Sequence, residues 1–156
     1  MSYNHSKFQE DPRSSWTIVL VVVQFACLGY LVFTGPLAAS SWPLLSLQVA
    51  ALGLGVWAVA VMRPRDVNVA PVVRPGAKLI TRGPYRLIRH PMYTSLLLLT
   101  TVWVANDYSP KRLAVLFLFA ANMVTKVIVE ERYLKTTFDA FDPYRRKTWR
   151  IIPFVF

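Results

Sequence analysis

The sequence predicts an all-α, polytopic membrane protein with about four transmembrane helices and a C-terminal pocket on the cytosolic side. Hydrophobic residues make up 54% of the 156 positions, and they gather in long uncharged runs. Runs of this length are typical of membrane spans. Cations flank the runs, and the chain is short for more than one domain. We therefore treat residues 1–156 as a single integral membrane domain.

The first predicted span is residues 16–33, an uncharged run of 18 residues. As a helix it would extend about 27 Å, close to the hydrocarbon thickness of about 30 Å. A cleavable signal peptide is the competing interpretation, because Ala38-Ala39-Ser40 offers small residues for cleavage. The run is longer than the usual apolar core of a signal peptide, which favours a retained span followed by a turn at 34–41.

The second predicted span is residues 42–62. It contains Gly53 and Gly55, and small residues of this kind let neighbouring helices pack closely. A polar stretch, residues 63–89, follows with seven cations and one acid. Four prolines precede Tyr85 in it, so a single continuous helix is not expected there.

Two further apolar runs complete the predicted bundle. Residues 91–105 would extend only about 22 Å as a helix, which is short for a full span. A turn at 106–110 separates them from residues 113–129, a run interrupted by Asn122 and Lys126.

The distribution of cations predicts the orientation of these four spans. The stretch after the second span holds seven cations, the region beyond Val129 holds six, and the loop after the first span holds none. The positive-inside rule then places both termini and the 63–90 loop in the cytosol, and we expect a multi-pass protein of the bacterial inner membrane. Lys111 and Arg112 fall on the opposite side and count against this orientation, but they are outnumbered.

The net charge of +10 does not indicate a nucleic-acid partner, because the cations flank apolar runs and form no separate basic face. Anionic lipid headgroups are the simpler partner. Cys27 is the only cysteine, so neither an internal disulfide nor a cysteine-based metal site is possible. The two histidines, His5 and His90, lie far apart, and we expect no metal.

Candidate chemistry begins at His90, which precedes Pro91. A residue before proline is displaced from helical geometry, and proline suits the first position of a helix. The third span should therefore begin here and present unpaired N–H groups suited to an anion. Tyr85 and Tyr93 flank this point. Each of these residues has an ordinary interpretation as well, since histidine and tyrosine are common at membrane interfaces.

Asn122, Lys126 and Glu130 recur at intervals of four and should share one helix face. Polar groups near the end of an apolar run are costly and usually have a purpose. Two structural alternatives remain for Lys126: an ion pair with Glu130, or snorkelling of the ammonium to the interface.

Glu131 should point about 100° further round the helix, because successive helical residues are separated by that angle. We rank it below Glu130 as a functional residue. Its expected partners are cations such as Arg132 or Lys135.

Three blocks of the sequence resemble one protein family. Residues 83–93, GPYRLIRHPMY, are similar to the Arg-His-Pro-x-Tyr signature of the isoprenylcysteine carboxyl methyltransferase family, which is related to the phospholipid methyltransferases. Residues 130–134, EERYL, resemble that family's Glu-Glu-x-x-Leu element, and residues 144–153 resemble its C-terminal end. The blocks occur in the family's order, and the resemblance covers roughly residues 76–153.

The resemblance implies S-adenosylmethionine-dependent methyl transfer to a lipophilic small-molecule or lipidated acceptor in the membrane. The soluble cofactor would enter the pocket from the cytosol and the acceptor from the bilayer. By the same resemblance the cofactor-binding positions are Lys78, Leu79, Ile80, Tyr85, His90, Pro91, Met92, Tyr93 and Glu130.

Lys126 and Glu130 match the family's catalytic pair, in which a basic residue orients the acceptor and the glutamate binds the cofactor. The family usually has arginine at the first position. Lysine lacks the bidentate fork that suits a carboxylate, which weakens the case for a prenylcysteine carboxylate as the acceptor.

Two alternative functions stay open at this point. Sterol reductases that use NADPH share a His-Pro-x-Tyr element, although they carry extra spans that this short chain lacks. A non-catalytic membrane interaction protein on the same fold is the second alternative, and the joint presence of His90, Tyr93 and Glu130 counts against it.

Overall fold

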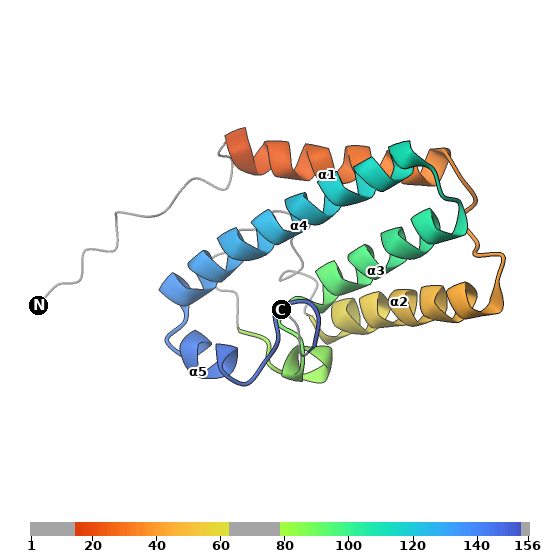
Figure 1. The fold of residues 1–156 in the computed structure, drawn as a ribbon. Coiled ribbons are helices and arrows are strands. Elements are labelled where there is room, and N and C mark those ends of the chain that lie inside the picture. Colours follow the sequence, from red (N-terminus) through yellow and green to blue (C-terminus); the bar gives the residue numbers. More distant parts are fainter. Residues whose placement is uncertain (1–14, 63–78, 154–156) are drawn as a thin grey trace, which may run out of the picture.

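A computed structural model describes residues 15–62 and 79–153, which are helical apart from short connections and one isolated β-bridge. Four long helices lie side by side and alternate in direction along the chain (Figure 1). They are α1 (Ser15–Phe33), α2 (Trp42–Val61), α3 (Pro91–Asn106) and α4 (Pro110–Thr137). Two short helices, the 3₁₀ turn η2 (Gly83–Arg86) and α5 (Phe141–Arg145), lie at one end of the bundle.

The predicted all-helical class is confirmed, and three helices are long and apolar enough to cross a membrane: α1, α2 and α4. At 16 residues, α3 extends about 24 Å, so its status as a fourth span stays a prediction. Helix α4 is longer than the predicted run. It continues helically past Val129 to Thr137.

The bundle carries its apolar side chains both inside and outside. Helix α2 packs mainly on α3, and α1 mainly on α4. Leu31, Trp103 and Phe119 lie in the core, together with the free thiol of Cys27. Many large apolar residues of α1, α2 and α4 face outward, Phe25, Val56 and Phe117 among them, as expected of helices that contact lipid.

Close packing of α2 against α3 depends on small residues. The Ser95 hydroxyl donates a hydrogen bond to the Ala51 carbonyl at 2.7 Å. A Cβ at Gly55 would lie 2.6 Å from the Ser95 oxygen, so the packing role predicted for Gly55 is confirmed. A Cβ at Gly53 would meet no heavy atom within 4 Å among the described residues, so the prediction was wrong there.

A buried arginine closes the opposite end of the bundle from η2 and α5. Arg112 is 2% exposed, and its guanidinium donates hydrogen bonds to the Leu31 carbonyl at 3.2 Å and the Trp103 carbonyl at 3.1 Å. It also bonds the Thr34 hydroxyl at 2.8 Å. The last carbonyls of a helix have no intrahelical partner, so one cation satisfies the ends of both α1 and α3. Arg112 is therefore not a solvated loop cation, which removes half of the objection to the predicted orientation.

We expect Arg112→Met to lower the stability of the bundle by about 3 kcal/mol, because it removes charge-assisted hydrogen bonds to buried carbonyls. Thermal unfolding in one detergent would measure the change. Lys111→Met is the matched control, since Lys111 is the exposed neighbour on the same helical turn. Equal melting temperatures for the two variants would show that the Arg112 contacts do not hold the helices together.

Candidate functional site

The candidate site lies at the end of the bundle where α2 ends, α3 begins and α4 ends (Figure 1). The chain after α4, residues 138–153, is called the tail below. It returns from α4 to run alongside the segment just before α3. Leu87 and Arg89 exchange backbone hydrogen bonds with Trp149, and the His90 N–H donates to the Arg150 carbonyl at 3.0 Å. The tail is thereby fixed across the start of α3.

His90 occupies the boundary that the sequence predicts. Its φ of −124° and ψ of 58° are non-helical, and Pro91 is the first residue of α3. One helical turn later, Thr94 donates a hydrogen bond from its hydroxyl to the Ile151 carbonyl at 2.7 Å. The first turn of α3 is therefore covered by the tail.

Glu131 is the ionic centre of the site, although sequence reasoning ranked it below Glu130. Its carboxylate is buried and accepts hydrogen bonds from Arg89 Nε at 2.7 Å and from Arg150 Nε at 2.9 Å. The predicted partners Arg132 and Lys135 were wrong. Both are exposed, because Glu131 points from α4 toward the start of α3 while these cations point to solvent.

Arg89 is the functional candidate that the sequence analysis missed. Its side chain is 6% exposed and holds the tail as well as Glu131. One guanidinium nitrogen donates to the Arg145 carbonyl at 2.9 Å and also bonds Thr148 through its carbonyl and hydroxyl oxygens. The signal was available in the sequence, because Arg89 directly precedes His90 in the motif.

The His90 imidazole lies between two carboxylates. Its Nδ1 is 3.7 Å from Glu130 Oε2, and its Nε2 is 3.6 Å from Glu131 Oε1. The ring stacks on Tyr93 with centroids 5.7 Å apart and planes at 21°. His90 Nε2 is buried and has no hydrogen-bond partner within residues 15–62 and 79–153, and the same holds for the Tyr85 hydroxyl. Buried polar atoms normally have partners, so these two are suited to a bound ligand.

Tyr85 and Tyr144 are both held as neutral phenols. The Tyr144 hydroxyl donates to the Tyr85 carbonyl at 2.7 Å, which joins the tail to η2. Burial raises the pKa of Tyr144 to about 12. Burial, with a smaller contribution from the negative charge of Glu130, also raises the pKa of Tyr85 above its ordinary value. Each hydroxyl can therefore donate a hydrogen bond throughout the physiological pH range.

Lys126 is fully buried, so the snorkelling alternative was wrong. Its ammonium donates a hydrogen bond to Gln24 on α1 and lies 5.8 Å from the centroid of the Tyr93 ring. One turn earlier, Asn122 donates to the Leu20 carbonyl at 3.0 Å. The predicted polar face of α4 thus packs against α1 and α3. Gln24 went unnoticed in the sequence, where its only signal is an amide inside an apolar run.

The predicted site residues fall into three groups. The first group gathers around the start of α3 and comes from η2, from α3 with its N-cap, and from α4. Its members are Tyr85, His90, Tyr93, Lys126 and Glu130. Pro91 is buried and Met92 half-buried in the first turn of the same helix. Leu79 and Ile80 stand before η2 with half-buried side chains, and Lys78 lies outside the described residues, so their binding role stays a prediction.

Two further observations concern the chemistry of this end. Within the described ranges no three His, Cys, Asp or Glu side chains are grouped so as to hold a metal ion. The tail lines a pocket of about 320 Å³, formed by residues 145–149, and none of the predicted cofactor-binding residues that the structure describes belongs to it.

We expect Glu131→Gln to destabilise the protein by about 3 kcal/mol, because it leaves two arginines without their shared counter-charge in a buried setting. The tail should also detach. Thermal unfolding would report the first effect, and faster trypsin cleavage after Arg145 to Lys147 the second. Glu130→Gln is the matched control, since that side chain is 29% exposed. Identical cleavage rates for both variants would contradict the role of Glu131 in holding the tail.

Comparison with known proteins gives two findings. A sequence model of the phospholipid methyltransferase family matches residues 45–140, from α2 to the end of α4. The cobalt-zinc-cadmium resistance protein CzcN of Cupriavidus metallidurans is 41% identical over 76 residues, which is 48% of this chain. That alignment spans only 35% of the length of CzcN. The family match covers well over half of the chain and includes both the His90 and the Glu130 segments, so the chain belongs to the phospholipid methyltransferase family.

Proposed function

We propose that this protein transfers a methyl group from S-adenosylmethionine to a lipophilic acceptor that resides in the membrane. Family membership supports methyl transfer at a membrane and favours neither a reductase nor a non-catalytic role. The observation that carries the proposal for this chain is the pair of buried polar atoms, His90 Nε2 and the Tyr85 hydroxyl. Neither has a hydrogen-bond partner in the described parts of the chain, and they belong to segments that flank Glu130.

The residues around these atoms fit the cofactor. Its methyl group is carried on a positively charged sulfur, which supplies the reactivity for a direct displacement. Aromatic faces attract such a cation, and Tyr93 presents a ring beside His90. The Glu130 carboxylate adds negative charge and can accept hydrogen bonds. His90 Nε2 and the Tyr85 hydroxyl would complete the polar contacts.

Lys126 supports a separate role for the acceptor. Its ammonium lies inside the bundle, bonded to Gln24 and facing the Tyr93 ring. A buried cation in an apolar segment is costly, so it marks a functional position. We propose that it orients an electron-rich group of the acceptor. The fixed tail would exclude water while the reacting atoms are aligned.

The orientation proposed from the charges places this end of the bundle in the cytosol, where the soluble cofactor is available. Exposed Arg82 offers a position for an introduced cysteine once Cys27 is replaced. In a bacterial inner membrane, labelling of that cysteine only from the periplasmic side would overturn the orientation.

The direct test of the function is incubation of the purified protein with a membrane lipid extract and S-adenosylmethionine labelled in its methyl group. We expect label in the organic phase, with product identification giving the acceptor. Thermal stabilisation by S-adenosylhomocysteine but not NADPH would separate methyl transfer from the reductase alternative. Failure of both S-adenosyl compounds to bind would leave a non-catalytic role.

Glu130→Gln should weaken S-adenosylmethionine binding about tenfold or more, because it removes a charge beside the proposed sulfonium site and keeps the size of the side chain. Calorimetry would measure the affinity. The melting temperature without ligand should match that of the unmodified protein. Unchanged affinity at a matched melting temperature would show that Glu130 is a surface charge.

Lys126→Met should lower turnover of the acceptor by more than it lowers cofactor affinity, since it keeps the apolar stem and deletes the charge. Lys126→Arg should retain activity if a positive charge is sufficient. Initial rates at saturating S-adenosylmethionine, with cofactor affinity measured in parallel, separate the two effects. Normal turnover by the methionine variant would assign Lys126 to helix packing through Gln24 alone.

A further inference from the structure

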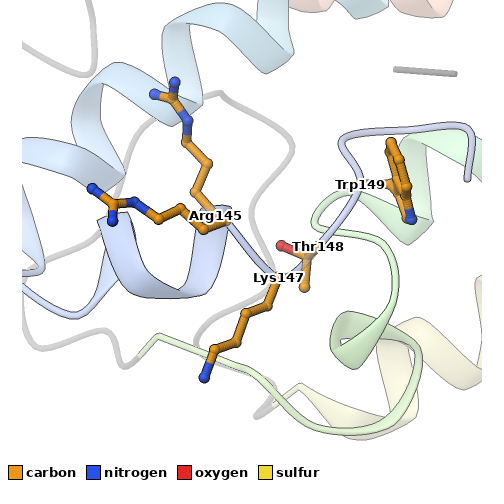
Figure 2. Close-up of a pocket in the computed structure, with 5 residues that line it drawn as sticks. Arg145, Lys147, Thr148 and Trp149 are labelled. Carbon is orange, nitrogen blue, oxygen red and sulfur yellow. The ribbon is translucent and has the colours of Figure 1, made fainter. Parts of the chain in front are cut away.

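The pocket on the tail is lined by cations that have no part in the proposed methyl-transfer site. It holds about 320 Å³ and is lined by Arg145, Arg146, Lys147, Thr148 and Trp149. Figure 2 shows Thr148 between the two labelled cations on one side and the Trp149 ring on the other. This volume is at the lower end of the range for small-ligand sites.

The three cations in this pocket have no counter-charge among the residues that the structure describes. Arg145, Arg146 and Lys147 are exposed, and no carboxylate within residues 15–62 and 79–153 lies within 4.0 Å of any of them. By contrast, two other cations of the region, Arg150 and Lys135, each face a carboxylate. The Thr148 hydroxyl donates to the Tyr144 carbonyl at 2.9 Å, so the three cations are the groups of this lining suited to a phosphate.

The backbone of the pocket is held in place. Arg89 donates hydrogen bonds to the carbonyls of Arg145 and Thr148. The backbone of Trp149 forms hydrogen bonds with the segment before α3. The pocket is therefore built on a fixed scaffold, although its cations are exposed.

The surroundings of the pocket point to a membrane surface. Trp149 is 37% exposed and lies beside Leu87, which is 52% exposed. The turn that carries Leu87 packs on the end of α2, where a Cβ at Gly83 would lie 3.4 Å from the Trp57 indole nitrogen. Trp57 is itself 53% exposed on a helix that faces lipid. Exposed apolar residues therefore occur at the pocket and on the neighbouring end of α2, and tryptophan is enriched at membrane interfaces.

We propose that the pocket at residues 145–149 binds the phosphate headgroup of an anionic membrane phospholipid, with Trp149 and Leu87 inserted at the interface. The cations at the pocket match a negative headgroup, and the exposed side chains of Trp149 and Leu87 match its acyl region. This site is separate from the proposed cofactor-binding residues and does not rest on the methyl-transfer proposal. It would anchor the tail to the membrane beside the start of α3.

Native mass spectrometry of the full-length protein in a neutral detergent tests the site, with phosphatidylglycerol, phosphatidylcholine and inorganic phosphate as probes. Phosphatidylglycerol should bind more tightly than phosphatidylcholine. Replacing two cations by R146Q and K147Q should weaken phosphatidylglycerol binding about 30-fold, as expected for two basic residues near an anionic headgroup. A charge-conserving variant with R146K and K147R should retain binding.

The matched control carries K111Q and R132Q, which remove the same charge from exposed positions that do not line the pocket. It should bind phosphatidylglycerol within about twofold of the unmodified protein. Equal weakening in both double variants, or equal affinity for the two lipids, would overturn the proposal. Displacement of the lipid by an equal concentration of inorganic phosphate would assign the pocket to a free anion and overturn it as well.

Discussion

The Glu131 carboxylate joins three parts of the chain that are distant in sequence. It lies on α4, and its two partners are Arg89, just before α3, and Arg150, near the end of the tail. A carboxylate at this level of burial requires opposite charge and hydrogen bonds. Because Arg89 also bonds two carbonyls of the tail, one ion cluster sets both the path of the tail and the position of the neighbouring His90. The hydrogen bonds between the tail and the start of α3 lie around that cluster.

At both ends of the bundle a buried arginine donates hydrogen bonds to backbone carbonyls. Helix ends expose carbonyl groups that have no intrahelical partner. Arg112 satisfies those of α1 and α3 at one end, and Arg89 satisfies carbonyls of the tail at the other. The difference lies in the anion. Asp107 is 46% exposed at 3.8 Å from Arg112, whereas Glu131 is buried at 2.7 Å from Arg89. Within the described residues each end has a buried nitrogen without a hydrogen-bond partner, Arg112 Nε at one end and His90 Nε2 at the other, but only at the second end is the neighbouring carboxylate buried.

The sequence predicts the helices well because an apolar membrane segment can be recognised from its local composition alone. Predicted runs at 16–33, 42–62 and 91–105 differ from α1, α2 and α3 by at most one residue at either end. Helix α4 exceeds its prediction because its last two turns are polar, and hydropathy does not report a helix that leaves the apolar layer. Local rules also placed His90 and Pro91 at the start of α3, since proline restricts its neighbour regardless of tertiary contacts.

Contacts between distant segments could not be predicted from local composition. The partners of Glu131 depend on the tail returning to pair with residues 87–90, and spacing along α4 carries no information on that return. Lys126 and Gln24 are 102 residues apart. The spacing of Asn122, Lys126 and Glu130 predicted a shared face but could not identify α1 as the element that meets it. Residue types and helix faces were therefore predictable, whereas partners across the bundle were not.

The hydrogen bond between Lys126 and Gln24 makes α1 part of the functional unit of this protein. The family match begins at residue 45, after α1. A fragment that starts at α2 would contain every matched motif and still leave the Lys126 ammonium without its amide acceptor. Helix α1 thus supplies the hydrogen-bond acceptor of Lys126 as well as an apolar helix of the bundle. Transplanting the matched region onto a different first helix would succeed only if that helix offered an oxygen at the depth of Gln24.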